Sequence, residues 1–240
     1  MDFLLEVIGA ILEGILEGFI EDENIPKWIR YGVLFLLLSG FLALIVFALI
    51  AAGDWGFRIF LGLLAAAILG MMVYVIWKIF RYGIFRPAKK EDLPEILKLY
   101  RSVIGKPGCT WSISYPNEAT LHEDFRTGNL YVLRQRRKLV GAGSIVPQNE
   151  LDDLDFWQHK ENVAEIARIV IHSDRQGHGY GKYLVDMLCR MLHRKGHKAV
   201  HLLAAKENHH ALNLYRESKF HNVGACHRYD HDFYAYERKL

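Results

Sequence analysis

Three glycines at alternate positions mark the stretch RQGHGYGKYL, residues 175–184. An apolar stripe at helical spacing begins directly after them, so this turn is expected to join a strand to a helix N-terminus. The first amides of a helix lack partners and carry a partial positive charge, and glycine lets a phosphate approach the backbone. The spacing therefore predicts a site for a phosphate-bearing ligand, most naturally a pyrophosphate.

Two familiar nucleotide loops do not fit this spacing. Counted from Gly177, the dinucleotide fingerprint GxGxxG requires a glycine where Lys182 stands. A Walker loop requires Ser or Thr after its Gly-Lys pair, and Tyr183 occupies that place. Neither NAD nor ATP is favoured.

The same residues match a known pattern. Gln176, Gly179 and Gly181 fit the (Q/R)xxGx(G/A) signature of the GNAT superfamily, the acetyl-CoA-dependent N-acetyltransferases. The segment AAKENHHALNLYRESKF, residues 204–220, resembles the second conserved segment of that superfamily. Four of its residues stand where members usually have the same types: Asn208, Ala211, Tyr215 and Phe220. The resemblance covers residues 82–240 and none of the first 80 residues.

The elements needed to position these residues can be read from the hydrophobic pattern. Strands are expected at GIFRPA, NLYVLRQ, KLVGAGSIV, EIARIVIHS, AVHLLAA, GACHRYD and DFYAYERKL, and helices at EDLPEILKLYRSVI, NEATLHEDFRTG, residues 180–195 and HHALNLYRESK. Asn117 is expected to cap the second helix, because its side-chain oxygen can accept from a free amide. This order is similar to that of the GNAT fold, an α/β (α+β) fold with a mixed, mostly antiparallel sheet flanked by helices.

The resemblance implies how the chain would bind acetyl-CoA. Backbone amides of residues 176–181 would hold the pyrophosphate, and backbone groups of Ile169 and Ile171 would pair with the pantetheine arm. The full set of residues implied to bind acetyl-CoA is Ile169, Ile171, Gln176, Gly177, His178, Gly179, Tyr180, Gly181, Lys182 and Asn208.

The resemblance also implies direct attack of an amine on the thioester, with Tyr215 in the position of the usual acid. A phenol is protonated at neutral pH and can protonate the departing thiolate. The base is left open between Glu165 and His172. Regular alternation would place Glu165 on one strand face with Ala167 and Ile169. Arg168 would then lie on the opposite face, and it could make Glu165 part of a charged pair instead.

The loop GCTWSISYP offers two aromatic residues, Trp111 and Tyr115, which either wall the acceptor pocket or anchor the loop to the core. The longer segment GCTWSISYPNEATLHEDFRTGNLYVL is similar to a recurrent bacterial subgroup of the superfamily.

Two long runs without charge precede this domain. They are YGVLFLLLSGFLALIVFALIAA, residues 31–52, and IFLGLLAAAILGMMVYVIW, residues 59–77. Each is long enough to cross a hydrocarbon core of about 30 Å as a helix, so a transmembrane hairpin is expected within residues 25–81. Residues 1–24 read as an acidic amphipathic helix that would pack against another helix, in this chain or in a partner.

The charges beside the runs predict their orientation. Basic residues gather outside the hairpin, and its connecting loop holds only Arg58, offset by Asp54. Both termini and the domain of residues 82–240 are therefore expected on the cytoplasmic side of the cell membrane. The flanking basic residues are Lys27 and Arg30 before the first run and Lys78, Arg81, Arg86, Lys89 and Lys90 after the second.

Other function classes find little support. A net charge of +3 without a basic stripe does not favour nucleic acid. Three cysteines without CxxC spacing suggest neither a disulfide framework nor a zinc ribbon. His193 and His197 have i, i+4 spacing, but no carboxylate completes a metal site with them, and no metal is expected.

These observations favour a membrane-anchored N-acetyltransferase that transfers an acetyl group from acetyl-CoA to a small-molecule or peptide amine. The alternative is a membrane scaffold or sensor that binds acetyl-CoA without catalysis. The two hypotheses differ in whether thiol is released when an amine is supplied.

Overall fold

The computed structural model describes residues 39, 40, 43, 46, 47, 50, 53, 55–146, 151 and 153–240, without the side chains at 71, 72, 75, 76, 78 and 79. The chain divides into two compact units, Met1–Arg81 and Tyr82–Leu240. The helix expected within residues 1–24 and most of the first charge-free run lie outside the described residues.

The described part of the first unit is dominated by α3, Trp55–Tyr82, a helix of 28 residues that contains the whole second charge-free run. Large apolar side chains project from it into solvent, among them Phe60 and Leu63, which are 60% and 67% exposed. Within the described residues, no helix combines the length and apolarity needed to cross a membrane.

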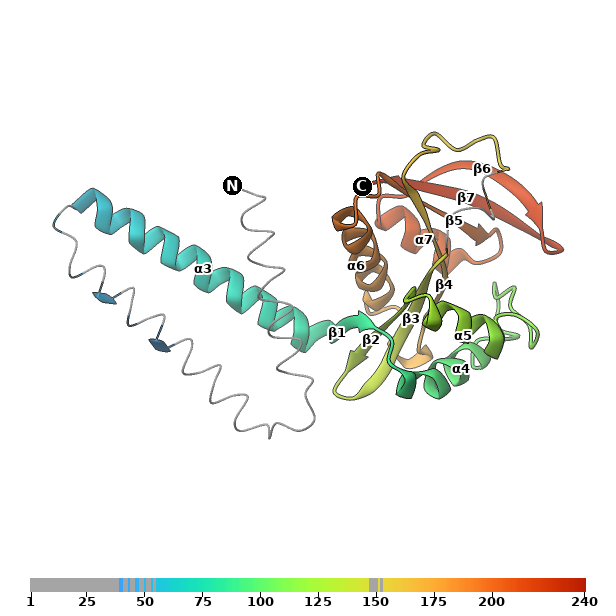
Figure 1. Cartoon of the computed structure of the whole chain (residues 1–240), viewed down its shortest axis with the longest axis horizontal. Coiled ribbons are helices and arrows are strands. Elements are labelled where there is room, and N and C mark those ends of the chain that lie inside the picture. Colours follow the sequence, from blue (N-terminus) through green and yellow to red (C-terminus); the bar gives the residue numbers. More distant parts are fainter. Residues whose placement is uncertain are drawn as a thin grey trace. The chain divides into compact units, whose positions relative to one another are not determined.

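The second unit is built on one sheet of seven strands in the order β1-β2-β3-β4-β5-β7-β6 (Figure 1). Every neighbouring pair is antiparallel except β4 and β5, so the expected mixed, mostly antiparallel sheet is present. The strands are β1 Ile84–Pro87, β2 Leu130–Gln135, β3 Lys138–Val146, β4 Val163–Ile171, β5 Ala199–Ala205, β6 His221–Arg228 and β7 His231–Lys239.

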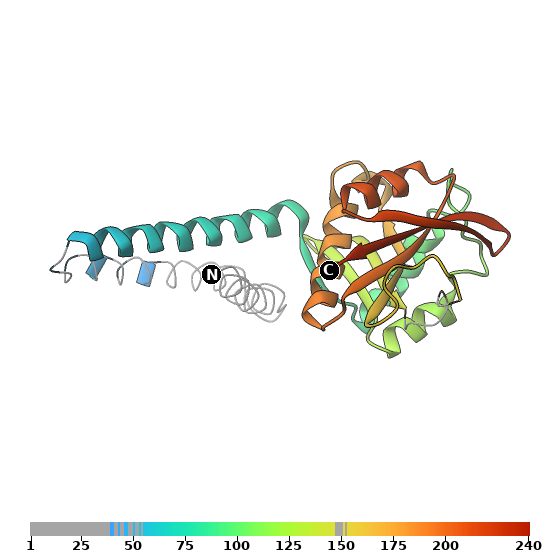
Figure 2. The ribbon, with the colours of Figure 1, turned by 90° about the horizontal axis from the view of Figure 1, so that it is seen from above.

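Four α-helices cover this sheet, two on each face (Figures 1 and 2). They are α4 Leu93–Arg101, α5 Glu118–Arg126, α6 Tyr180–Arg194 and α7 His209–Glu217. Buried side chains of α4 and α5 form one core cluster with the sheet, and those of α6 and α7 form another. The two short 3-10 helices are η1 Lys90–Asp92 and η2 Ser173–Arg175.

Local sequence accounts for several of these boundaries. The stripe predicted after the glycines is buried in α6, where Leu184, Leu188 and Leu192 contact the sheet. The predicted cap is confirmed, because the Asn117 side chain accepts from the Thr120 amide at 2.9 Å. The helix expected over 91–104 is shorter, since Pro94 lies in the first turn of α4 and the residues before it form η1.

Two glycines of β3 allow α6 and β4 to pack closely against it. A Cβ atom on Gly143 would lie 2.6 Å from Ile169 Cδ1, and one on Gly141 would lie 2.5 Å from Ile171 Cδ1. Because such distances are far below van der Waals contact, a larger residue at either position would force the Ile169 or Ile171 side chain to move, and at position 141 its Cβ would also lie 2.8 Å from the Val170 carbonyl oxygen of β4.

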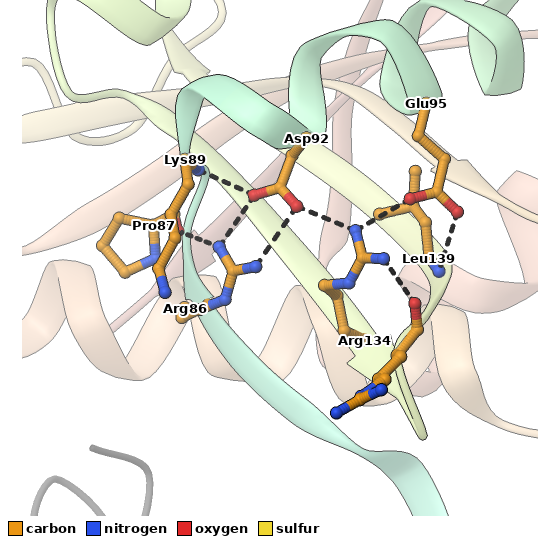
Figure 3. Close-up of polar contacts among 8 residues, drawn as sticks. Arg86, Pro87, Lys89, Asp92, Glu95, Arg134 and Leu139 are labelled. Atoms are coloured by element: carbon orange, nitrogen blue, oxygen red, sulfur yellow. Dashed lines mark hydrogen bonds and ion pairs between the residues drawn. The ribbon is translucent and has the colours of Figure 1, made fainter. Parts of the chain in front are cut away.

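A buried carboxylate joins the start of the domain to β2 (Figure 3). Asp92 accepts from Arg86 of β1 at 2.8 Å, from Arg134 of β2 at 2.8 Å and from the Lys89 amide at 2.7 Å. Arg134 also pairs with Glu95 of α4 at 2.8 Å. These contacts thus hold β2 against β1 and the start of α4, which come much earlier in the chain.

Candidate acetyl-CoA site

The predicted glycine turn joins η2 to the N-terminus of α6. Gly177 and Gly179 adopt φ of +73° and +84°, and Gly179 is the N-cap of the helix. Such φ values are readily adopted only by glycine. The amides of Gly177, His178 and Gly179 donate to no acceptor among the described residues, and the first amides of α6 have none within the helix. A row of donors is therefore available to an anion.

Side chains brace this turn. Gln176 Nε2 donates to the Ile171 carbonyl at 3.0 Å, and His178 Nδ1 donates to the Gln176 carbonyl at 2.7 Å. Gln176 thus connects the end of β4 to the turn. Gly181 serves packing instead, since a Cβ there would lie 3.3 Å from Leu214 of α7. The alternate glycines have different roles.

Tyr82 also lies beside the turn. Its ring stacks on Tyr183 with centroids 4.7 Å apart, and its hydroxyl would be 3.5 Å from a Cβ on Gly179. Sequence reasoning treated Tyr82 only as a domain boundary. No local pattern pairs it with a helix that begins 98 residues later, so no sequence signal identified it.

The strands next to the turn separate. β4 pairs with β5 only at Val163–Glu165, opposite Ala199–His201, whereas β5 continues to pair with β7 as far as Ala205. The remainder of β4 pairs only with β3. Among the described residues, one edge of β4 beyond Glu165 therefore has no neighbouring strand.

The direction of the β4 amides follows from one bond. His172 N donates to Val140 O, on the side of β3. Because backbone groups alternate along a strand, those of Ile169 and Ile171 point away from β3, toward the edge without a neighbour. The Ile171 carbonyl is already occupied by Gln176. Both amides and the Ile169 carbonyl are thus placed to bind an extended chain.

Tyr215 lies on α7, buried between Phe220 and Tyr236 at ring-centroid distances of 5.8 and 6.0 Å. Its hydroxyl makes no hydrogen bond with any described residue. Burial raises the pKa of this phenol above its usual value of 10.0. The side chain therefore stays protonated and holds a proton that it can donate.

The expected alternation of β4 is wrong, and a β-bulge is the reason. Before it, Ala164 and Ile166 face the cluster of α6; after it, Ile169 and Ile171 do. Glu165 and Ile169 therefore lie on opposite faces of β4, whereas the prediction placed them on the same face. Arg168 lies on the α5 face rather than opposite Glu165, and its guanidinium pairs with Asp124.

Three other expected residues are placed as follows. Glu165 is half-buried and is the last residue of β4 that pairs with β5. His172 is exposed and its Nδ1 accepts from the Asp174 amide. Asn208 caps α7 by accepting from the Ala211 amide at 3.0 Å, which assigns its oxygen a structural role.

The loop before α5 is anchored at both of its aromatic residues. The Trp111 ring contacts that of Tyr100 at 5.3 Å and packs on the core. Tyr115 is 45% exposed, and its hydroxyl accepts from Arg168 Nη1 at 3.0 Å. Trp111 therefore anchors the loop, whereas Tyr115 presents its ring to solvent beside β4.

His193 and His197, the pair with i, i+4 spacing, lie at the C-terminal end of α6. A cavity of about 380 Å³ is lined there by His159, His193, Gly196, His197, Lys198, Lys239 and Leu240. It is separate from the glycine turn, which lies at the N-terminus of the same helix. Across the described residues, no group of three His, Cys, Asp or Glu side chains is arranged to hold a metal ion.

Comparison with known proteins agrees with this geometry. Residues 94–220 match the family model described as the acetyltransferase (GNAT) family. The comparison with curated protein sequences gives no match.

Solved structures share the fold. The ribosomal-protein-alanine N-acetyltransferase from Brucella melitensis superposes with a TM-score of 0.54 at 18% identity, covering 65% of this chain and 99% of that one. A putative acetyltransferase from Salmonella typhimurium, solved with its cofactor acetyl-CoA, gives 0.53 at 16% identity, covering 65% and 92%. A putative acetyltransferase from Staphylococcus aureus gives 0.51 at 24% identity, covering 65% and 99%.

Proposed function

Because this chain belongs to the GNAT family of acetyl-CoA-dependent N-acetyltransferases, we propose that its glycine turn and the unpaired edge of β4 bind acetyl-CoA and present the thioester to an amine. One observation carries the proposal: the unpartnered amides of residues 177–179 lie at the end of the same strand whose outer edge is open. A pyrophosphate and the extended arm attached to it require this combination of donors.

The chemistry assigned to the site is direct transfer. The amine nitrogen forms a bond to the thioester carbon, the carbon–sulfur bond breaks, and the thiolate takes a proton from Tyr215. The negative charge that develops on the thioester oxygen is stabilised by a β4 amide on the unpaired edge. Tyr215 suits the acid role because burial of its side chain raises the pKa of the phenol and keeps it protonated.

Glu165 is the proposed base. It is half-buried at the point where β4 leaves β5, whereas His172 lies beyond the last residue of β4 and is exposed. An amine must lose a proton to become nucleophilic, and a carboxylate acting through one water can accept it. Removal of this charge should slow transfer.

The acceptor is proposed to be a small-molecule or peptide amine. Two of the similar structures, from Brucella melitensis and Escherichia coli, are named as ribosomal-protein-alanine N-acetyltransferases. Tyr115, exposed beside β4, is placed to contact such an acceptor. Peptides with a free N-terminal amine are the first acceptors to test.

The same proposal places the enzyme on a membrane. The apolar residues exposed along α3 and the two charge-free runs support a helical hairpin as anchor. The excess of basic residues outside the hairpin supports a cytoplasmic location for both termini, where acetyl-CoA is available.

The proposal is tested by calorimetric titration of the detergent-solubilised chain with acetyl-CoA. Gly179→Trp should abolish binding, because the side chain would occupy the position of the phosphate. Gly128→Trp is the matched control. Gly128 has a similar positive φ of +71°, nothing lies within 4 Å of a Cβ atom placed there, and the residue belongs to the turn between α5 and β2 rather than to the glycine turn. Equal affinity of the two folded variants would remove the site from the glycine turn. Binding without thiol release across an amine panel would favour the scaffold alternative.

A further inference from the structure

Arg168 has an unusual backbone for a strand residue. Its φ is +54°, and it is the one non-glycine residue with positive φ inside a strand of the described chain. Ser144 of β3 faces Ala167 and Ala142 faces Val170, so Gly143 alone faces two residues of β4, Arg168 and Ile169. This is a β-bulge, and bulges redirect the groups that follow them. A non-glycine residue persists in such a conformation only if its surroundings enforce it.

A buried carboxylate from another element supplies that constraint. Asp124 of α5 accepts from Arg168 Nε and Nη2, both at 2.7 Å, and the two side chains are 8% and 7% exposed. Asp124 also accepts from the Ser144 hydroxyl at 2.6 Å. Ser144 stands opposite the residue just before the bulge. One carboxylate therefore bonds both strands at the point where their register shifts.

The same guanidinium reaches the loop that precedes α5. Arg168 Nη1 donates to the Tyr115 hydroxyl at 3.0 Å, and Arg101 of α4 donates to the Ile113 carbonyl of the same loop. Arg168 lies in the part of β4 that no longer pairs with β5. The network is thus located at the candidate site, although neither charged side chain is exposed enough to be a reactant.

Resting on the function proposed above, we propose that Asp124 and Arg168 are positioning residues that hold the β4 bulge so that the Ile169 amide faces the thioester oxygen of acetyl-CoA. Ile169 is the second of the two residues that face Gly143, and its amide is the first one after Arg168 that points away from β3. In a regular strand that kept the pairing of Ala167 with Ser144, Ile169 would lie opposite Ala142 and its amide would point toward β3 instead.

A purely structural ion pair is the competing explanation. Buried ion pairs often add little to stability compared with apolar residues, so stability alone gives a weak reason for this arrangement. The two explanations differ in one respect. If positioning is the role, a backbone that favours positive φ without any charge should replace the pair, whereas a structural pair has no such substitute.

The experiment uses the full chain in detergent and measures two quantities: acetyl-CoA affinity by calorimetry, and the single-turnover rate of thiol release from bound acetyl-CoA with water as nucleophile. Asp124→Asn should lower this rate about ten-fold or more, as expected for a misplaced oxyanion donor, with affinity little changed. Glu123→Gln, which removes a neighbouring exposed pair with Arg126 of the same helix, should leave both quantities unchanged.

A matched pair of double variants separates geometry from charge. Asp124→Ala with Arg168→Gly removes both charges but retains a residue that adopts positive φ easily, whereas Asp124→Ala with Arg168→Ala penalises that φ. Neither leaves a buried charge without its partner, so both should fold. The glycine variant should stay within about three-fold of the wild-type rate and the alanine variant should fall about ten-fold below it, because roughly that factor separates their preferences for the bulge.

Equal rates in the two double variants, or an unchanged rate in Asp124→Asn, would overturn the inference while leaving the acetyl-CoA site intact. Wild-type protein that binds acetyl-CoA without accelerating thiol release would also overturn it. Wild-type protein that binds no acetyl-CoA would remove the proposed function and this inference together.

Discussion

Tyr215 depends on its surroundings for its chemistry. The ring packs against Phe220 and Tyr236, and burial raises the pKa of its phenol. A buried phenol is a poor anion and a reliable proton donor.

Tyr215→Phe removes the proton but keeps the ring. Turnover should fall by about 10²- to 10⁴-fold with unchanged acetyl-CoA affinity, as expected for loss of a general acid. Tyr236→Phe is the control, because this tyrosine packs on the same ring. Similar turnover in wild type and Tyr215→Phe would assign the proton to another group.

The pH dependence follows from the same burial. Since the folded pKa of Tyr215 lies above 10.0, wild-type turnover should show no loss through tyrosine ionisation up to about pH 10. A descending limb near pH 9 that disappears in Tyr215→Phe would contradict this assignment.

Glu165→Gln should remove the ascending limb of the pH–rate profile and lower turnover about 10²-fold, because the amide cannot accept a proton. His172→Gln tests the other candidate. If the limb survives in Glu165→Gln but is lost in His172→Gln, the base is His172.

At the scale of elements, single carboxylates hold together segments that are remote in sequence. Asp92 joins β1 and β2 to the start of α4, and Asp124 joins α5 to β3 and β4. Helix and strand propensities form each element separately. These ion pairs set the position of one element against another.

Asp92→Asn should destabilise the domain by about 1–3 kcal/mol, because the half-buried guanidinium of Arg86 loses this carboxylate and that of Arg134 keeps only the one of Glu95. Burial alone would raise the pKa of Asp92, but hydrogen bonds from Arg86 and Lys89 and the charges of Arg86 and Arg134 outweigh it. The folded pKa thus lies below its usual value of 3.8. This contribution to stability is complete above that pH and is lost as the pH falls through the folded pKa.

The measurement is denaturant unfolding of wild type and variant from pH 7 to about pH 3. The difference in free energy of unfolding should shrink toward the acid end. Glu91→Gln, an exposed neighbour, should show no such difference. A constant difference across the range would mean that the amide loses packing rather than charge.

At the scale of the whole molecule, the chain consists of two units, and the second begins at Tyr82. The two units differ in how much apolar surface their described residues expose. Residues 82–240 bury their apolar side chains in cores on both sides of a sheet. α3 leaves many of its own exposed. Exposed apolar surface of this kind is normally covered by lipid or by another protein.

The full chain should therefore sediment with membranes after a high-salt wash, whereas a chain that begins at Tyr82 should remain in the supernatant. Leu63→Arg combined with Ala67→Arg should release the full chain, because each charge at the centre of a span costs about 2.5–3.5 kcal/mol. Recovery of the wild-type chain in the washed supernatant would contradict the anchor.

Local sequence by itself determined the glycine turn, the stripe of α6 and the Asn117 cap. Each depends on residues within a few positions of one another, where helix geometry and φ preference act directly. The seven strands were also predictable, since alternation and turn residues are local signals. The family resemblance rested on the same short segments.

Only the tertiary structure decided which groups meet. The bulge at Arg168 reverses the faces of β4, and it is held by Asp124, 44 residues earlier in the chain. An inference from the alternation of apolar residues holds only for a regular strand, and this alternation carries no information about a partner residue that far away in the sequence. The placement of Glu165, the direction of the Ile169 amide and the contact of Tyr82 with the turn all follow from such long-range contacts, and for that reason no pattern in the sequence contained them.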